Sequence, residues 1–244
     1  MNIIKLNAID STNSYLKELA LKKDLENFTV AVAKHQTSGR GQMGTNWISD
    51  YDKNLTFSML VKFDALEVSH QFYSSMAVAI GVLEVLKKQV ENKVCIKWPN
   101  DILAEGDKVA GILIENVLKG NNIKHSIIGV GLNVNQELFP NDIGNVSSLK
   151  LLLGKNIKND ELLVQLIQSI TLFMAHVENN EFEILKNIYY KNLYKFNETA
   201  IFIDNLNEKF EGKIVGVEES GKLLVETSHK KIRKFNLKEI KFAD

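Results

Sequence analysis

Tight turns join consecutive β-rich runs between residues 94 and 134, and this feature constrains the fold of the chain more than any other. The runs are Val94–Trp98, Ile102–Ala104, Val109–Glu115 and Ile127–Val134. Glu105-Gly106-Asp107 marks a turn between the second and third runs, and Lys119-Gly120-Asn121-Asn122 is a hairpin signal before the fourth. Strands connected in this way predict an antiparallel or mixed sheet rather than a doubly wound parallel one.

Helical and extended patterns surround these four strands. Ser11, Thr12 and Asn13 precede apolar residues at helical spacing, so this polar trio is expected to begin a helix, with Ser or Thr as its cap. Further strands are predicted at Ile3–Leu6, Phe28–Lys34 and Leu55–Phe63, and helices at Val68–Val90, Asn159–Glu178 and Glu181–Tyr194.

The pattern of the sequence changes after Asn197. Short strands are predicted at Ala200–Ile203, Phe210–Val217, Leu223–Thr227 and Lys231–Phe235. Turn residues separate them, so this part of the chain is expected to form a small, compact β-barrel. The predicted fold is therefore α+β, with a mixed, largely antiparallel sheet and helices over residues 1–196 and a barrel over residues 197–244.

Composition narrows the function classes. Lys plus Arg and Asp plus Glu both number 30, so the net charge is zero, which argues against a surface that coats nucleic acid. The single cysteine, Cys95, excludes an intrachain disulfide and is interpreted as a buried thiol. The five histidines are scattered and are interpreted as structural or surface residues. With no membrane-spanning run and no signal-peptide pattern, a cytoplasmic location is expected.

The most unusual stretch is Ser38-Gly39-Arg40-Gly41-Gln42-Met43-Gly44. Glycines allow backbone N–H groups to approach an anion, and the guanidinium of Arg40 adds a planar, charge-assisted donor. This chemistry suits a phosphate or an acyl-phosphate, although no Gly-Lys-Ser/Thr ends the stretch as in a Walker loop. A flexible surface loop is the alternative. Trp47 follows directly and is expected to cover the base of the loop.

A second candidate is Lys97-Trp98-Pro99-Asn100-Asp101. Pro99 removes a ladder donor, so Asn100 and Asp101 are expected where the strand breaks. A carboxylate at such a position can bind Mg²⁺ or orient a nucleotide. The alternative is an ordinary surface ion pair between the lysine and the aspartate.

A third candidate combines Lys108 with glycines in two strands. Gly111 interrupts the run Val109–Glu115, and Gly129 and Gly131 interrupt the next run. A glycine inside a strand weakens it unless another group must approach its backbone. The two strands therefore predict a shallow pocket whose floor lacks side chains. A sheet bend or bulge, with an exposed hairpin lysine, is the alternative.

Taken together, these stretches resemble biotin protein ligases. The matching stretches are Asp10-Ser11-Thr12-Asn13, Gln36-Thr37-Ser38-Gly39-Arg40-Gly41, Trp47, Lys97-Trp98-Pro99-Asn100-Asp101, Lys108-Val109-Ala110-Gly111-Ile112-Leu113 and Gly129-Val130-Gly131-Leu132-Asn133. The stretches at residues 97–101 and 108–113 are specific for this family when they occur together. The resemblance implies a class II synthetase-like catalytic domain and an SH3-like C-terminal domain. Since the chain starts at the catalytic strand, it resembles the short form, which has no DNA-binding domain and no membrane association.

The resemblance also implies an activity and residue roles. ATP, with Mg²⁺, would activate biotin as biotinyl-AMP, and a lysine of a biotin carboxyl carrier protein would accept it, in an enzyme that is a monomer or a homodimer. Biotin contacts are implied for Ser11, Thr12, Asn13, Gln36, Arg40, Gly41, Gln42, Trp47, Lys108 and Gly111. Nucleotide contacts are implied for Arg40, Asn100, Asp101, Lys108 and Asn133, with Asp101 also holding Mg²⁺.

Three of these residues are the implied catalytic ones. Lys108 would stabilise the negative charge that grows during adenylation. Asp101 would help the incoming lysine to lose its proton. Arg40 would lie in the loop that closes over biotin and the adenylate phosphate.

The chain departs from the family pattern in this loop, which commonly reads Gly-Arg-Gly-Arg-x-Gly-Arg-x-Trp. Gln42 and Thr45 replace the second and third arginines, so two positive charges near the intermediate are missing. We therefore expect biotinyl-AMP to leave this enzyme more readily than a ligase that has all three arginines.

Two other functions are compatible with the sequence. A lipoate–protein ligase, or a lipoyl or octanoyl transferase, shares the related catalytic fold, but an octanoyl transferase needs a nucleophile and Cys95 is badly placed for that role. The polar residues 11–13 suit a ureido ring better than a dithiolane. The other alternative is a non-enzymatic binding module, and Lys108 and Asp101 argue against it.

Overall fold

The larger sheet is the part of the fold that the tight turns predicted. The computed structural model describes residues 2–90, 94–140 and 143–243. In these residues seven strands follow one another in the order β1-β2-β3-β7-β6-β5-β4. Their bounds are β1 (Ile3–Ile9), β2 (Val30–Gln36), β3 (Leu55–Glu67), β4 (Val94–Lys97), β5 (Asp101–Ala104), β6 (Asp107–Lys119) and β7 (Asn122–Leu132). β1 and β2 are parallel and the other neighbours are antiparallel, which confirms a mixed, largely antiparallel sheet.

The connections explain which pairs are parallel. β6 and β7 are joined by Gly120 and Asn121, and Gly120 takes the positive φ of 61° that this tight turn requires. α1 (Thr12–Lys22) connects the parallel strands β1 and β2. The side chain of Ser11 caps this helix by accepting a hydrogen bond from the N–H of Ser14, so the predicted polar helix start is confirmed.

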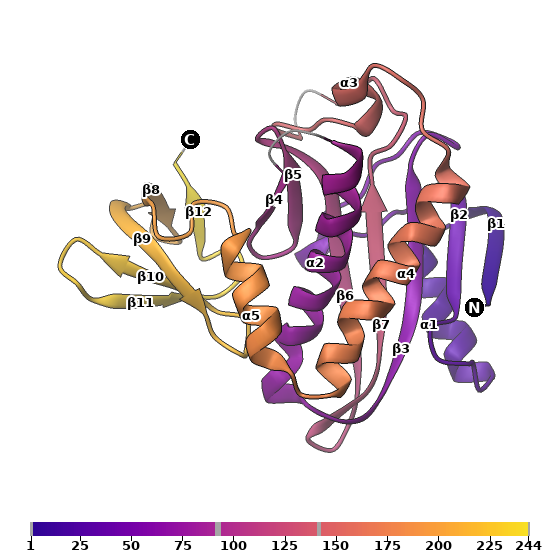
Figure 1. Ribbon diagram of the computed structural model, residues 1–244, viewed down its shortest axis with the longest axis horizontal. Helices are drawn as coiled ribbons and strands as arrows, with labels where there is room; N and C mark the ends of the chain where they lie inside the picture. Colours follow the sequence, from indigo (N-terminus) through magenta and orange to yellow (C-terminus); the bar gives the residue numbers. More distant parts are fainter. Residues whose placement is uncertain (1, 91–93, 141–142, 244) are drawn as a thin grey trace.

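Helices cover the two faces of the sheet unequally. α2 (Gln71–Gln89) and α4 (Asn159–Glu178) pack on one face with α5 (Phe182–Lys191) beside them, whereas α1 lies on the other (Figure 1). Successive residues of a strand point to opposite faces. Accordingly, Met59 of β3 belongs to the core beneath α2, while Leu60 packs with Leu16 of α1.

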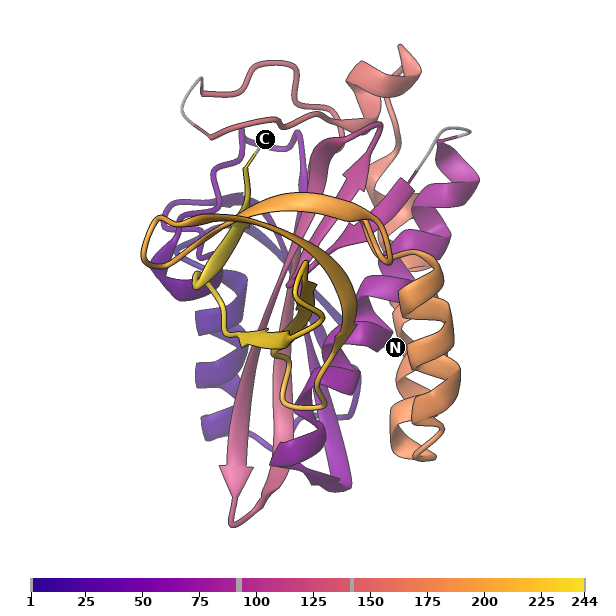
Figure 2. The same cartoon turned by 90° about the vertical axis from the view of Figure 1, so that its left-hand side faces the viewer.

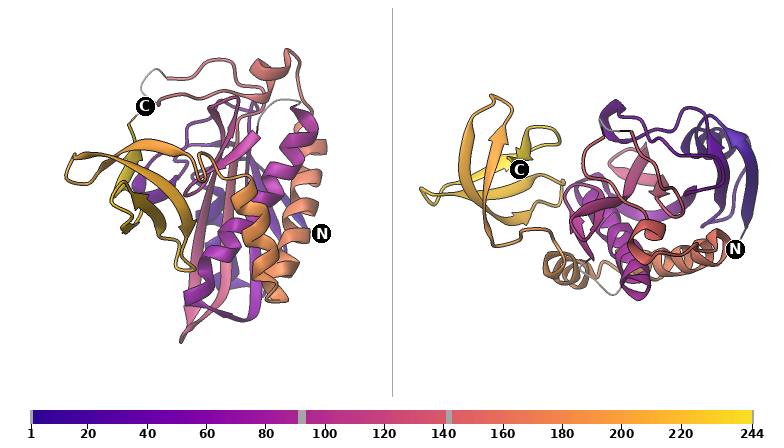
Figure 3. Two further views of the ribbon diagram at one scale, coloured as in Figure 1. Left: turned by 60° about the vertical axis from the view of Figure 1, so that its left-hand side comes forward. Right: turned by 90° about the horizontal axis from the view of Figure 1, so that it is seen from above.

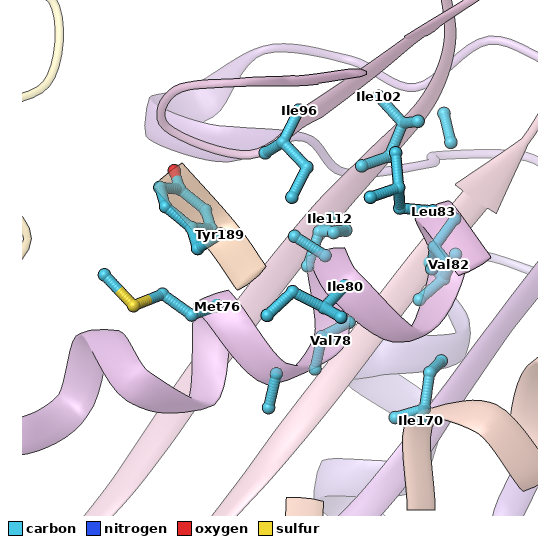
Figure 4. Packing of buried hydrophobic residues seen from close by; sticks show 14 of the residues in the cluster. Met76, Val78, Ile80, Val82, Leu83, Ile96, Ile102, Ile112, Ile170 and Tyr189 are labelled. Atoms are coloured by element: carbon cyan, nitrogen blue, oxygen red, sulfur yellow. The ribbon is translucent and has the colours of Figure 1, made fainter. Parts of the chain in front are cut away.

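The larger core lies between α2, α4 and the sheet. α2 is apolar almost all round and is correspondingly buried. Figure 4 shows Ile80 of α2 in one cluster with Ile112 of β6 and Tyr189 of α5. Burying one such aliphatic side chain contributes about 1.5–3 kcal/mol. A Cβ on Gly81 would come within 2.8 Å of the backbone of Ile170, so this glycine lets α2 and α4 approach closely.

A second, smaller sheet follows α5. Its five strands have the order β11-β10-β9-β8-β12, and all its pairs are antiparallel. Their bounds are β8 (Thr199–Asp204), β9 (Lys209–Val217), β10 (Leu223–Thr227), β11 (Ile232–Phe235) and β12 (Ile240–Phe242). The sheet curves round on itself beside the larger one, as Figures 2 and 3 show, in agreement with the expected SH3-like barrel. Trp98 joins the two parts, because its indole N–H donates to the carbonyl of Gly221 at 3.0 Å.

Some elements differ from the predictions. A 3₁₀ turn, Val68–His70, precedes α2, and α5 ends at Lys191 rather than at Tyr194. A short helix, α3 (Leu149–Leu153), was not predicted, and neither was β12. Both are too short to show a periodic pattern, and β12 forms only because the distant strand β8 pairs with it. No helix in the described parts of the chain is long and apolar enough to cross a membrane.

Candidate active site

A cavity of about 1290 Å³ is enclosed by the larger sheet, the loop of residues 39–47 and the barrel. Paired residues of β6 and β7 form its floor: Gly111 is opposite Gly131, and Leu113 is opposite Gly129. These residues face the α1 side of the sheet, as does Ile127, which packs against that helix. Three of these four floor residues are glycines, in agreement with the glycine floor that the two strands predicted.

The packing above the floor requires two of these glycines. A Cβ on Gly131 would overlap the indole of Trp47, and a Cβ on Gly129 would overlap the side-chain amide of Asn13. Trp47 thus lies against β7 inside the cavity. Its indole N–H is buried and has no hydrogen-bond partner among the described residues. Leaving a buried donor unpaired costs about 1–3 kcal/mol, so this group fits a ligand that would accept from it.

One end of the cavity is polar. The side-chain oxygen of Gln36 accepts hydrogen bonds from the backbone N–H and the hydroxyl of Thr12, at 2.8 and 3.0 Å. Ser58 of β3 donates to the Oδ1 of Asn13 and lies 2.7 Å from the hydroxyl of Thr12. Ser11, Thr12 and Asn13 are all buried. The structure brings the predicted residues together here and adds Ser58, which the sequence analysis missed.

The other end of the cavity is charged. The Nζ of Lys108 lies 2.6 Å from Oδ1 of Asp101, and the two side chains are only 32% and 23% exposed. The same Nζ lies 5.8 Å from the centre of the Trp47 ring. Asp101 therefore pairs with Lys108, not with Lys97 of its own motif. Because both charges are partly removed from water, they interact more strongly than an exposed surface pair would.

The turn between β4 and β5 is fixed by hydrogen bonds to β6. The side chain of Asn100 donates to the carbonyl of Ile112 at 2.7 Å, and the N–H of Ile112 donates to the carbonyl of Asn100 at 2.9 Å. The Trp98-Pro99 bond in this turn is cis. These contacts hold Asp101 at the first position of β5, opposite Gly111.

The glycine-rich loop folds back on itself. The N–H of Gly41 donates to the carbonyl of Thr45 at 2.6 Å, and the N–H of Trp47 donates to the carbonyl of Gly39 at 2.9 Å. A Cβ on Gly39 would overlap the carbonyl of Trp47, and one on Gly41 would overlap the hydroxyl of Thr45. In this conformation the two glycines allow the two arms of the loop to pack closely. The N–H of Gly41 is hydrogen-bonded within the loop, so it is not available to bind an anion.

Two contacts hold the loop to the rest of the molecule. The guanidinium of Arg40 reaches both carboxylate oxygens of Glu115 on β6, at 3.3 Å each. The ammonium of Lys238, from the barrel, donates to the carbonyl of Met43 at 2.8 Å. The sequence analysis identified neither Glu115 nor Lys238.

Of the predicted site residues, only Asn133 does not line the cavity. It is buried, and its side-chain amide donates to the carbonyl of Ser147 at 3.0 Å. This amide thus helps to hold the following segment of chain, and the nucleotide contact implied for Asn133 stays a prediction. Cys95 is buried, as predicted.

The carboxylates that line the cavity suit a magnesium ion whose other ligands come mainly from a substrate. Among the described residues, no three His, Cys, Asp or Glu side chains gather closely enough to enclose a metal. Mg²⁺ usually keeps several waters and binds to one or two carboxylates together with substrate phosphates. Asp101, which lines the cavity, fits that role.

Comparisons with known proteins agree with this site. Residues 6–133 match the family model of the biotin/lipoate A/B protein ligase family, and residues 197–240 match that of the biotin protein ligase C terminal domain. The bifunctional ligase/repressor BirA of Bacillus spizizenii is 30% identical over 230 residues, which span 93% of this chain and 70% of that protein. The biotin–[acetyl-CoA-carboxylase] ligase of Paracoccus denitrificans is 26% identical, over 88% of this chain and 90% of that protein.

A solved structure shows the same fold along the whole length. The biotin protein ligase from Aquifex aeolicus, in complex with biotin and ATP, has a TM-score of 0.80 and 28% identity, and the match covers 99% of each chain. The first family model alone spans more than half of the residues. The chain belongs to the biotin/lipoate A/B protein ligase family.

Proposed function

We propose that the chain is a biotin–protein ligase that activates biotin with ATP as biotinyl-AMP and transfers it to a lysine of a biotin carboxyl carrier protein. The observation that carries this proposal is the layout of the cavity. Polar groups around Thr12 and Asn13 lie at one end, the Lys108–Asp101 pair lies at the other, and glycines separate them. Biotin has the same layout, with a ureido ring, an apolar middle and a carboxylate. The names of the relatives and the Aquifex complex support the same substrates.

The polar end would recognise the ureido ring. Buried N–H and C=O groups of a ligand need partners, and Thr12 and Asn13 line that end of the cavity with a hydroxyl and an amide group. A ligand without the ureido group, such as the dithiolane of lipoate, would bring no N–H or C=O group to this polar end. Such a mismatch discriminates strongly between substrates.

Lys108 would serve the first chemical step. The biotin carboxylate attacks the α-phosphorus of ATP, and pyrophosphate leaves. Negative charge grows on the transferred phosphate, and the ammonium of Lys108 can stabilise it from its position between Asp101 and Trp47. Mg²⁺ would neutralise phosphate charge when bound, with Asp101 as its protein ligand and Asn100 beside the nucleotide.

Asp101 would serve the second step. The ε-amine of the carrier lysine attacks the acyl carbon of biotinyl-AMP, and AMP leaves. The amine must lose a proton, and the carboxylate of Asp101 lies within the cavity to accept it. The mechanism needs no covalent enzyme intermediate.

The loop and the barrel would enclose the intermediate. The mixed anhydride hydrolyses in water, so a loop that covers the cavity protects it. Residues 42, 43 and 45 of the loop line the cavity, as do Lys238 and Lys241 of the barrel. We place the division between a catalytic domain and the barrel domain between residues 196 and 197, because the match to the C-terminal family model begins at residue 197.

ATP–pyrophosphate exchange tests this proposal. The assay is run with biotin, with lipoate and with neither added. We expect exchange that depends on biotin, since adenylation is reversible. Exchange that depends on lipoate and not on biotin would overturn the assignment of biotin as the substrate. The absence of exchange with either acid would favour a non-enzymatic binding module.

A further inference from the structure

We infer that Glu115 is a positioning residue that ties the loop carrying Arg40 to the ring-binding end of the cavity. The inference rests on the proposed function, since it concerns how the same cavity holds biotin. Glu115 lies on β6 opposite Ile127 of β7, on the same face as the glycine floor. It does not line the cavity itself. Its effect on a bound molecule must therefore pass through the groups that it holds.

The carboxylate of Glu115 contacts several side chains. Its two oxygens receive the guanidinium of Arg40 at 3.3 Å, and Oε2 also accepts from the side-chain amide of Asn13 at 3.0 Å. The Nζ of Lys17 lies 3.7 Å from Oε1. The Glu115 side chain is only 18% exposed, whereas that of Arg40 is 49% exposed. A carboxylate in this position is largely shielded from water, so its charge-assisted hydrogen bonds are stronger than those of a surface pair.

Glu115 fixes the orientation of the Asn13 amide. The nitrogen of this amide faces two groups that can only accept, the Glu115 carboxylate and the carbonyl of Leu113. The oxygen must then face the opposite way, where Ser58 donates to it above Gly129. The Oδ1 of Asn13 is thus the atom of this amide that can accept a hydrogen bond at the polar end of the cavity. Without the carboxylate, the amide could turn over and present its donor instead.

Glu115 also holds one arm of the loop in place. Arg40 precedes the turn of residues 42–44 that covers the cavity, and Glu115 anchors it through two parallel contacts. The hydroxyl of Ser14 lies 3.5 Å from the same guanidinium. One carboxylate therefore couples the donor–acceptor pattern for the biotin ring to closure of the loop above it. The distant Lys108–Asp101 pair makes no contact with it.

The experiment measures biotin binding to the full chain with a Glu115→Gln substitution. The amide keeps the size of the side chain but loses the charge and one acceptor. We expect the dissociation constant of biotin to rise about tenfold through faster dissociation, because hydrogen bonds to a charged group are lost. At saturating biotin, the KM for ATP should stay within about twofold, since the charged end of the cavity is intact. Glu67→Gln, at an exposed carboxylate on β3 of the same sheet, is the matched control.

A second variant separates positioning from folding. Arg40→Gln removes the other partner from the more exposed side, so it tests the same contact even where Glu115→Gln unfolds the chain. We expect both variants to speed biotin dissociation, and the double variant to have a smaller effect than the two single effects combined, because the contact between Glu115 and Arg40 is lost in all three. Equal effects of Glu115→Gln on biotin and on ATP, or fully additive effects of the two substitutions on biotin dissociation, would overturn the inference. Failure of the unaltered protein to bind biotin would instead refute the proposed function.

Discussion

The Nζ of Lys108 and Oδ1 of Asp101 lie 2.6 Å apart, so the cation and the carboxylate proposed for the two chemical steps are paired with each other. An incoming carboxylate and phosphate would compete with Asp101 for the ammonium. Drawing Lys108 toward the substrate would release Asp101 for Mg²⁺ and then for the acceptor lysine. One ion pair can thereby hold both side chains in place until the substrates separate them.

Substituting Lys108 by glutamine should act on chemistry more than on binding. We expect Lys108→Gln to lower biotin-dependent ATP–pyrophosphate exchange by about 100-fold or more, because a charge aimed at the growing negative charge is lost. The affinity for biotin should change much less, since residues 11–13 are untouched. Lys124→Gln, at an exposed lysine of β7, is the control and should leave exchange unchanged. An equal loss in both lysine variants would contradict the role of Lys108.

Restoring a loop arginine should help the enzyme to retain its intermediate. Gln42 lines the cavity at a position where related loops carry an arginine. We expect Gln42→Arg to slow the release of biotinyl-AMP by about tenfold, since a charge-assisted contact to phosphate is gained. Release is measured by chasing labelled intermediate from the enzyme. If the variant releases it as fast as the unaltered protein, the charge deficit does not govern retention.

The glycine floor can be tested by adding one methyl group. A Cβ on Gly129 would overlap the amide of Asn13, so Gly129→Ala should displace that side chain and raise the KM for biotin about tenfold or more. The control is Gly216→Ala in the barrel, where a Cβ would meet its neighbours at an ordinary 3.5 Å. Equal KM values for the two variants would show that the floor does not shape the biotin pocket.

The barrel should influence the loop through one lysine. Lys238→Met removes the hydrogen bond to the carbonyl of Met43, which is worth about 1 kcal/mol. We expect faster tryptic cleavage after Arg40 and faster hydrolysis of the intermediate. Lys241→Met, at another exposed lysine that lines the cavity, should change neither rate. Indistinguishable rates for the two variants would mean that the barrel does not order the loop.

Local sequence patterns were enough to predict the sheet and the glycine floor of the cavity, whereas the polar end was predicted only from the resemblance to biotin protein ligases. Turn residues and apolar runs fix strands such as β6 and β7, and glycines in both strands predicted the floor. The cap at Ser11 was equally visible, because polar residues before a helical pattern have a local cause.

Contacts between distant segments were not predictable in this way. Ser58 lies within a continuous buried strand, and only the folded structure reveals that it contacts Thr12 and Asn13. Glu115 ends the predicted strand Val109–Glu115, yet its partner Arg40 is 75 residues away in sequence. Lys238 reaches Met43 across 195 residues. The hydrogen bond from Asn133 to Ser147 was not predictable either, because Ser147 belongs to a segment that has no pattern of its own.

Transfer of labelled biotin to a purified carrier domain tests the central claim most directly. The chain is mixed with labelled biotin, Mg²⁺ and the carrier domain, with and without ATP, and a carrier whose acceptor lysine is replaced by arginine serves as the control. The account predicts label on that one lysine, only with ATP, and almost none when Lys108→Gln replaces the unaltered enzyme. Absence of label on the lysine with ATP present, or equal labelling without ATP, would contradict it.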